Sequence, residues 1–215
     1  SVYEKFKFGS FIKGFLLCKT ESFDFVFDSN KILKLSIFLI LLSYLAGAYQ
    51  PFINDPNLNF SYTELLIKFI VLLMQGAFII SGFYFLGITF FANNKRVGLS
   101  SNNEIINDES YKILTIRRIF QLISFSQLPV IFGLIFTFIG INTFPGTVGF
   151  FIFINTILLI SLYTKSIYIS YGFEIDINTS KQARYIKSFL IVLFTYFPST
   201  IIFQLFISGL IKDLI

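Results

Sequence analysis

The stretch from Arg117 to Gly140 decides the fold, and it reads RRIFQLISFSQLPVIFGLIFTFIG. Two arginines stand at its front edge, and the 23 residues from Ile119 to Ile141 carry no charge. As a helix these residues would be about 35 Å long at roughly 1.5 Å per residue, which is enough to cross a hydrocarbon core of about 30 Å. The stretch is too long and too apolar for an ordinary buried helix, so it predicts a membrane span.

The composition of the whole chain supports this interpretation. Of the 215 residues, 55% are hydrophobic and 13% are charged, and the mean hydropathy is +0.76. Soluble domains carry about 25% charged residues. We therefore expect an all-α, polytopic membrane protein whose residues 31–215 form a transmembrane domain.

The apolar runs predict five spans, at 33–49, 65–91, 119–141, 147–168 and 188–211. Pro51 is expected to close the first span.

Two connections stand out by their polarity. Residues 92–112 form the longest one, and residues 174–187 form a second polar loop. At the end of the fourth span, Tyr163, Tyr168 and Tyr171 are expected at the headgroup layer, where amphipathic rings gather.

Residues 1–30 predict an amphipathic segment at the membrane interface. Phe8, Phe11, Ile12 and Phe15 follow helical spacing, and the lysines fall mostly elsewhere. An amphipathic cap packed on the bundle is the alternative. Residues 21–28 alternate acidic and aromatic side chains, which fits either an extended clasp or a short helix.

The distribution of positive charge predicts the orientation. Lys and Arg number six in residues 1–34, none in 50–64, five in 92–118, none in 142–146 and four in 165–187. Because loops rich in Lys and Arg stay in the cytoplasm, we expect the N-terminus inside and the C-terminus outside. Seven cations are expected to contact lipid headgroups: Lys5, Lys7, Lys13, Lys95, Arg96, Arg117 and Arg118.

The reactive residue types that many sites need are scarce. The chain has no histidine and one cysteine, so His- or Cys-rich metal sites and an internal disulfide are excluded. No phosphate-binding loop, dinucleotide fingerprint or nucleophile elbow is present. We therefore expect no catalytic site, no cofactor and no metal. No basic stripe is paired with exposed stacking aromatics, so nucleic-acid binding is not expected either.

Four uncharged polar residues lie inside the predicted spans: Gln121, Gln127, Asn155 and Gln204. Such side chains hydrogen-bond between helices, and a polar substrate path is the alternative. Small residues mark close helix packing, within the bundle or, alternatively, between molecules. The candidates for helix packing are Ala77, Ser81, Gly82 and Pro129.

The layout resembles the Yip family, named for interaction with Ypt/Rab GTPases. The likeness rests on an aromatic approach at Phe23–Phe27, on Ser124–Pro129 in the third span, on Ser161-Leu162-Tyr163 in the fourth, and on Ala183 before the fifth. The Asp-Tyr-Tyr-Gly-Pro-like motif of eukaryotic members is missing, so the likeness is to bacterial and organellar relatives. The resemblance implies a non-enzymatic role in organising membranes or trafficking.

These observations favour a non-catalytic membrane protein that acts as a scaffold, membrane organiser or accessory subunit. It would contact lipids and other membrane proteins through residues 1–30 and 92–116, in a bacterial inner membrane or an organellar (thylakoid-type) one. The alternative is a small-molecule transporter, or its substrate-binding subunit, that uses Gln127, Asn155 and Gln204.

Overall fold

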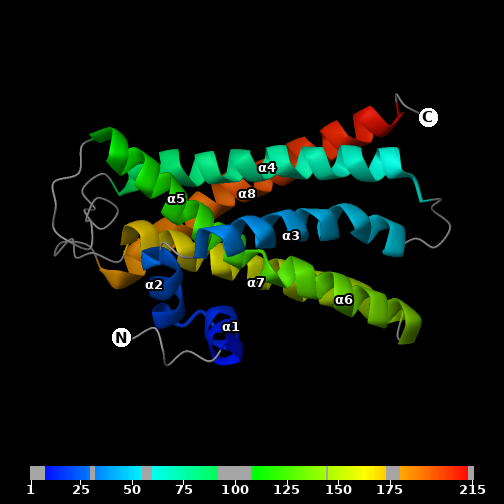
Figure 1. Cartoon of the computed structure of the whole chain (residues 1–215), viewed down its shortest axis with the longest axis horizontal. Coiled ribbons are helices and arrows are strands. Elements are labelled where there is room, and N and C mark those ends of the chain that lie inside the picture. The colour runs from blue at the N-terminus through cyan, green and yellow to red at the C-terminus, as the bar shows by residue number, and fades with distance from the viewer. Residues whose placement is uncertain are drawn as a thin grey trace.

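The chain is all-α over the residues that the computed structural model describes, which are 8–29, 32–54, 60–91, 108–143, 145–172 and 180–212. The long helices lie side by side in one bundle, and two short helices pack against one end of it (Figure 1). The helices are α1 (Phe8–Leu16), α2 (Thr20–Asp28), α3 (Leu33–Asn54), α4 (Tyr62–Phe90), α5 (Asp108–Ser126), α6 (Leu128–Thr143), α7 (Val148–Ile167) and α8 (Lys181–Lys212). A 3-10 turn, η4 (Pro145–Thr147), precedes α7, and a π-helix, η5 (Tyr168–Gly172), follows it.

Five stretches of helix are long and apolar enough to cross a membrane, as predicted. They are Leu33–Ile53, Tyr62–Phe90, Ile116–Ile139, Val148–Tyr171 and Lys181–Leu210. The protein is therefore an integral membrane protein by the length and composition of its helices.

The third span is the most buried of the five. Of its most apolar 18-residue window, 56% is buried, against 17–28% for the other four spans. It consists of the end of α5 and most of α6, and it packs against α3 and α7. The other spans turn large apolar side chains outward on their remaining faces, as a lipid environment requires.

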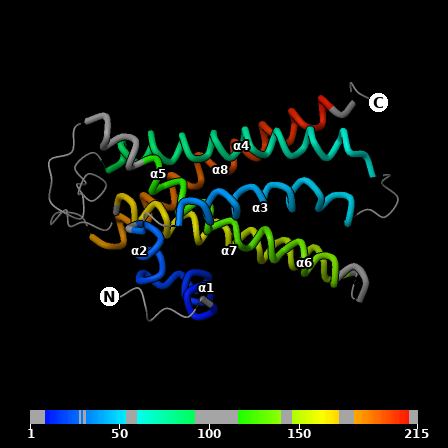
Figure 2. The backbone as a smooth tube through the Cα atoms, viewed as in Figure 1, coloured from blue at the N-terminus to red at the C-terminus, as the bar shows by residue number. Residues whose placement is uncertain are grey.

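The third span is not one continuous helix, because it breaks at Gln127 (Figure 2). Pro129 has no backbone N–H, and in an unbroken helix its ring would collide with the carbonyl of Phe125. The break places Pro129 in the first turn of α6, where the missing N–H is tolerated. The Val130 N–H donates to the Gln127 carbonyl at 2.9 Å and so starts the new helix.

Three helices extend further than the predicted spans. Hydropathy marks where a chain enters the lipid, and a helix can begin before that point or end after it. α5 begins at Asp108, inside the predicted 92–112 connection, and α8 begins at Lys181, inside the predicted 174–187 loop. α3 runs through Pro51 to Asn54. Pro51 lies in its last turn, where a proline removes only one backbone hydrogen bond from a helix that is about to end.

α4 begins with a serine N-cap. The Ser61 side chain accepts a hydrogen bond from the Glu64 N–H at 3.4 Å, which satisfies one of the free donors of the first turn. Glu64 also pairs with Lys68 one turn later, and Lys68 lies 4.6 Å from the centroid of the Phe52 ring. The one described cation near this end of α4 is therefore neutralised.

α1 and α2 form a hairpin, so residues 21–28 are a short helix. α1 ends in a Schellman motif: the Cys18 N–H donates to the Phe15 carbonyl and the Lys19 N–H to the Gly14 carbonyl, both at 2.9 Å. Cys18 takes the left-handed conformation that the motif needs, with φ of 55°. Ser22 of α2 lies so close to Gly14 that no side chain fits there.

Phenylalanine side chains hold this hairpin to the bundle. Phe15 is fully buried and stacks on Phe23 with ring centroids 4.1 Å apart. The ring centroid of Phe125 of α5 lies 5.7 Å from that of Phe11 and 5.8 Å from that of Phe15. The hairpin is thus part of the folded core.

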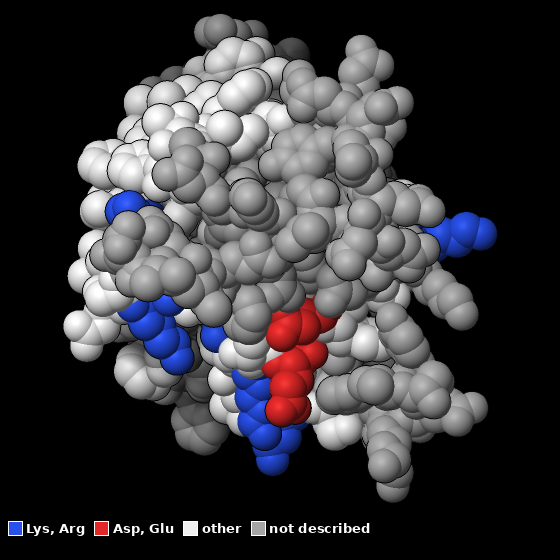
Figure 3. Space-filling view, turned by 90° about the vertical axis from the view of Figure 1, so that its left-hand side faces the viewer, with Lys and Arg blue, Asp and Glu red and all other residues white. Residues whose placement is uncertain are grey.

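Most described Lys and Arg side chains gather at the end of the bundle where α4 ends and α5 and α8 begin, which we call the basic end. Figure 3 looks onto this end and shows several of them around its rim, beside acidic side chains. The opposite end, where α3 ends and α4 begins, is called the far end.

Candidate functional site

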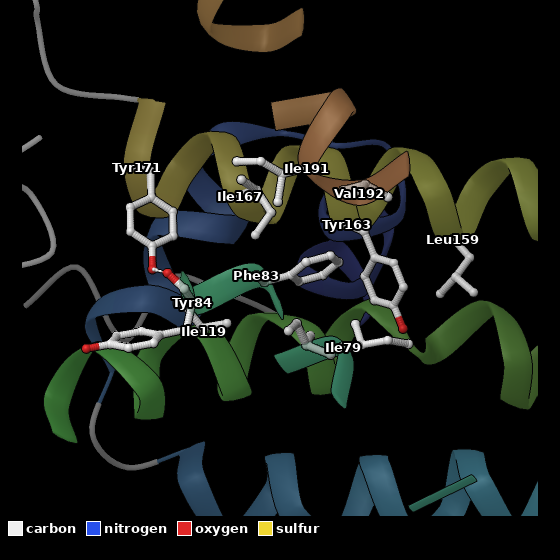
Figure 4. Packing of buried hydrophobic residues seen from close by; sticks show 11 residues of the cluster. Ile79, Phe83, Tyr84, Ile119, Leu159, Tyr163, Ile167, Tyr171, Ile191 and Val192 are labelled. Carbon is white, nitrogen blue, oxygen red and sulfur yellow. Dashed lines mark hydrogen bonds between the residues drawn. The ribbon is translucent and has the colours of Figure 1, made fainter. Parts of the chain in front are cut away.

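A cluster of aromatic and branched side chains fills the middle of the bundle near the basic end (Figure 4). Phe83 of α4 meets Tyr163 of α7 edge to face, with ring centroids 5.4 Å apart. Nearer the basic end, the Tyr171 hydroxyl donates to the Tyr84 carbonyl at 3.3 Å. The cluster adjoins the polar features described next, since Tyr163 belongs to both.

Two polar contacts join α7 to the break in the third span. The Gln127 side chain donates a hydrogen bond to the Tyr163 hydroxyl, and both residues are buried. One turn further toward the basic end, the hydroxyls of Ser126 and Ser166 lie 3.0 Å apart. Two adjacent residues, the last of α5 and the break residue itself, are therefore joined to α7 by hydrogen bonds in the membrane interior.

A small cavity of about 120 Å³ lies next to this seam. Its walls come from α3, α4, α6, α7 and α8, and include Tyr44, Gln75, Gln127 and Tyr163. Tyr44 reaches the cavity because Gly76 of α4 has no side chain; a Cβ there would lie less than 3 Å from the Tyr44 hydroxyl oxygen and from two atoms of its ring. The space holds a few water molecules at about 30 Å³ each, but no larger ligand.

A second, larger cavity of about 810 Å³ continues toward the far end. The two cavities share Gly47, Leu72, Gln75 and Tyr196 in their walls. The Gln75 side chain donates to the Thr200 hydroxyl at 3.2 Å, so a bond between α4 and α8 lies at the boundary. The size is that of a pocket for a small ligand, and we treat this larger cavity as the candidate site.

The larger cavity is rich in uncharged hydrogen-bonding groups. Its polar lining residues come from four helices, α3, α4, α7 and α8, and include Gln50, Gln75, Thr156, Thr200, Gln204 and Ser208. Lys68 also lines it, but its charge is balanced by Glu64. Such a site can recognise hydroxyl and amide groups, and it offers no unbalanced charge from its described lining.

The four predicted polar residues have separate locations. Gln127 lines the small cavity, and Gln204 is exposed on α8 at the larger one. Asn155 of α7 packs against Gly133 of α6. Gln121 is buried and donates to the Ser29 carbonyl at 2.8 Å, which ties α5 to the end of α2. Gln127 and Gln204 therefore line two different, adjoining cavities, and neither Gln121 nor Asn155 lines either of them.

The small residues predicted for helix packing lie on two faces of α4: Gly82 packs within the bundle, and for Ala77 and Ser81 packing between molecules stays a prediction. Gly82 packs against Thr195 of α8, where a Cβ would lie less than 3 Å from the threonine methyl. Ala77 and Ser81 are exposed, so they make no close helix packing within the chain. Their spacing does not reveal on which side of the helix the neighbours lie. Pro129 is buried at the break.

The predicted headgroup cations also differ from one another. Lys13 is exposed on α1 and Arg117 is half-buried. Arg118 is buried with its guanidinium 4.8 Å from the centroid of the Phe27 ring, so it packs against α2, and its contact with lipid headgroups stays a prediction. The remaining four, Lys5, Lys7, Lys95 and Arg96, lie outside the described residues.

The tyrosines of the fourth span are not at the surface. Tyr163, Tyr168 and Tyr171 are all buried, and the π-helix η5 turns the last two inward. The prediction that these three rings face the headgroup layer was made from their position along the span. It was wrong because that position does not show whether a side chain is on the inner or the outer face of a helix.

Sequence reasoning missed Gln75, Tyr44 and Tyr196, which line the small cavity. Gln75 is an uncharged polar residue in mid-span, just as the three glutamines and the one asparagine that were selected are. The tyrosines could have been found as aromatic hydroxyls far from either end of a span. Among the described residues, no group of three His, Cys, Asp or Glu could hold a metal ion.

We expect Gln127→Leu to lower the free energy of unfolding modestly. The change removes the bond to Tyr163, and hydrogen bonds of this kind inside membranes average about 0.6 kcal/mol and reach about 1.7. Unfolding of Gln127→Leu, Tyr163→Phe and the double variant in detergent gives the coupling energy. Gln182→Leu, which is exposed at the start of α8, is the control; equal losses in it would contradict the assignment.

Cys18 should react with iodoacetamide only at higher pH than a free thiol. Burial raises the pKa of the Cys18 thiol, and the nearby Lys165 cation opposes this shift. Less thiolate is therefore present at a given pH, and alkylation rates measured against pH should rise late. Lys165→Met removes the opposing charge and should move the profile to still higher pH; a shift to lower pH would contradict this geometry.

Comparison with known proteins adds no assignment to this geometry: no family model, no curated protein and no solved structure matches the chain.

Proposed function

We propose that this protein is a non-catalytic scaffold or accessory subunit of a larger membrane assembly. In this proposal the basic end and the N-terminus face the cytoplasm of a bacterial cell, or the equivalent side of an organellar membrane. The proposal includes a distant kinship with the Yip family, on the sequence likeness described above.

The observation that carries the proposal is the attachment of the α1–α2 hairpin at both ends of α2. At its start, the Lys165 ammonium donates to the Thr20 hydroxyl at 2.9 Å. At its end, Arg118 lies over the Phe27 ring. Just after it, the Ser29 carbonyl accepts the hydrogen bond from Gln121. α2 therefore has a fixed position at the basic end.

The fixed hairpin presents a mixed surface. Leu17 is 60% exposed at the turn, and Lys13, Lys19 and Glu21 are exposed around it. An apolar side chain surrounded by charges of both signs is suited to contact with a partner protein at the headgroup level. A preformed surface also loses less conformational entropy on binding than a free segment would, which supports a docking role.

Site-specific crosslinking tests this function. A photoreactive phenylalanine analogue at Leu17 is activated in native membranes, and adducts are identified after gentle purification. Phe153, which is exposed on the lipid-facing side of α7, is the matched control. We expect a reproducible protein adduct at Leu17 that Lys13→Glu with Lys19→Glu abolishes. Only lipid adducts at Leu17, with the protein purifying alone in mild detergent, would overturn the proposal.

The orientation has its own test. Reporter tags at Ser1 and Ile215 should appear on opposite sides of the membrane, with the tag at Ser1 in the cytoplasm. Tags in the same compartment would overturn the proposed arrangement.

A second candidate function is small-molecule transport or substrate binding. The observation that favours it is the pair of adjoining cavities, which extend from Gln127 in mid-membrane toward Gln204 near the far end.

A further inference from the structure

We propose that the larger cavity is a binding site for an amphiphile with an uncharged, hydroxyl-rich headgroup, such as a glycerol or sugar ester of a fatty acid. The site does not depend on the scaffold function, since it lies toward the opposite end of the bundle from the α1–α2 hairpin.

The size and position of the cavity support a ligand. Its volume of about 810 Å³ falls within the range of roughly 300–1,000 Å³ that is usual for small-molecule pockets. It lies among α3, α4, α7 and α8 within their membrane-spanning segments. A ligand there is surrounded by lipid-crossing helices, so one that partitions into the membrane can reach it.

The polar lining indicates which headgroup fits. Gln75, Gln204 and Thr200 each carry both donor and acceptor atoms. A hydroxyl group also donates and accepts, so several hydroxyls on one headgroup match this lining. The Gln75–Thr200 bond closes the inner side, where only about 120 Å³ remains, so the headgroup stops at this level.

The charge of the lining disfavours an ionic headgroup. Lys68 is the charged residue among those described around the cavity, and it is already paired with Glu64 and placed over Phe52. A carboxylate or phosphate would have to displace Glu64 to gain that charge. A cation would lie in an apolar region without a free acidic partner in the described lining, which is costly.

The apolar part of the lining accounts for the acyl chain of the ligand. Leu72 and Ile207 line the same cavity as the glutamines. On the outer side of α8, Leu205 and Phe206 are exposed next to Gln204 in sequence. A headgroup bound at Gln75 and Gln204 would thus leave its acyl chain among apolar side chains and lipid.

The probe for the test is monooleoylglycerol, added to the purified 215-residue chain in a detergent whose headgroup carries no hydroxyl groups and followed by native mass spectrometry. Oleate and oleylamine share its chain and differ in headgroup charge. We expect saturable one-to-one binding of monooleoylglycerol that oleate and oleylamine do not displace. Octyl glucoside competition separates recognition of any polyhydroxyl headgroup from recognition of glycerol alone.

Two variants make the test specific. Gln75→Leu with Gln204→Leu should weaken binding about tenfold or more, because two hydrogen bonds to the headgroup are lost. Thr156→Phe fills part of the space and should abolish binding, while Gln182→Leu at the basic end of α8 should bind as the unchanged protein does. Thermal unfolding of each variant shows that it is folded. Equal binding of all three amphiphiles, or unchanged binding in both cavity variants, would overturn the proposal.

Discussion

Phe15→Ala is expected to lower the free energy of unfolding by about 3–5 kcal/mol, the range for large aromatic side chains removed from a core. Phe15 is fully buried, stacks on Phe23 and contacts the Phe125 ring across the interface between the hairpin and α5. The alanine would leave an empty space between the rings of Phe23 and Phe125, which the Phe15 ring now fills. Thermal unfolding in detergent measures the loss.

A second measurement distinguishes local from global loss, since the hairpin can detach while the spans stay folded. Alkylation of Cys18, which lies between the two short helices, should become faster in Phe15→Ala. Leu17→Ala removes an exposed side chain two residues away and should change stability by less than about 0.5 kcal/mol. Similar stability for both variants would show that the hairpin is not held by these rings.

Gly87→Leu is expected to destabilise the protein by about 1–3 kcal/mol, the usual cost of inserting a side chain into a packed site. A Cβ at Gly87 would lie less than 3 Å from three atoms of the Tyr171 ring, so α4 or the π-helix η5 must move. Unfolding in detergent gives the size of the change. Gly149→Leu is the control, because no atom lies within 4 Å of a Cβ at that position.

A double-mutant cycle assigns this cost to one contact. In a Tyr171→Ala background the same Gly87→Leu change should cost much less, because the ring that it collides with is gone. The same cost in both backgrounds would mean that the strain arises elsewhere on α4.

The five spans could be predicted from the sequence because a membrane places a simple demand on the chain. A run such as Ile119–Ile141 is long, apolar and uncharged, and few other structures need all three properties. The break at Gln127 was only partly foreseeable. Pro129 in the sequence indicates a missing backbone donor, but tertiary contacts determine whether a helix bends or breaks at a proline.

The candidate site was harder to predict, because it depends on which side of each helix faces inward. Gln127 and Gln204 were selected from their depth in the membrane and do line the cavities. Arg118 was assigned to the headgroups from its position before a span, yet its side chain is buried over the Phe27 ring. The hydropathy of an apolar helix is nearly uniform around its axis, so the sequence holds little signal for its inward face.

The interruption at Gln127 has a mechanical consequence. Two stiff rods that meet at one non-helical residue can change the angle between them without losing helical hydrogen bonds. Because Ser126 and Gln127 are both bonded to α7, the pivot is held at one depth. Because α6 packs against both α3 and α7, a change of angle at this pivot, as in a thicker or thinner bilayer, has to move α6 together with those two neighbours.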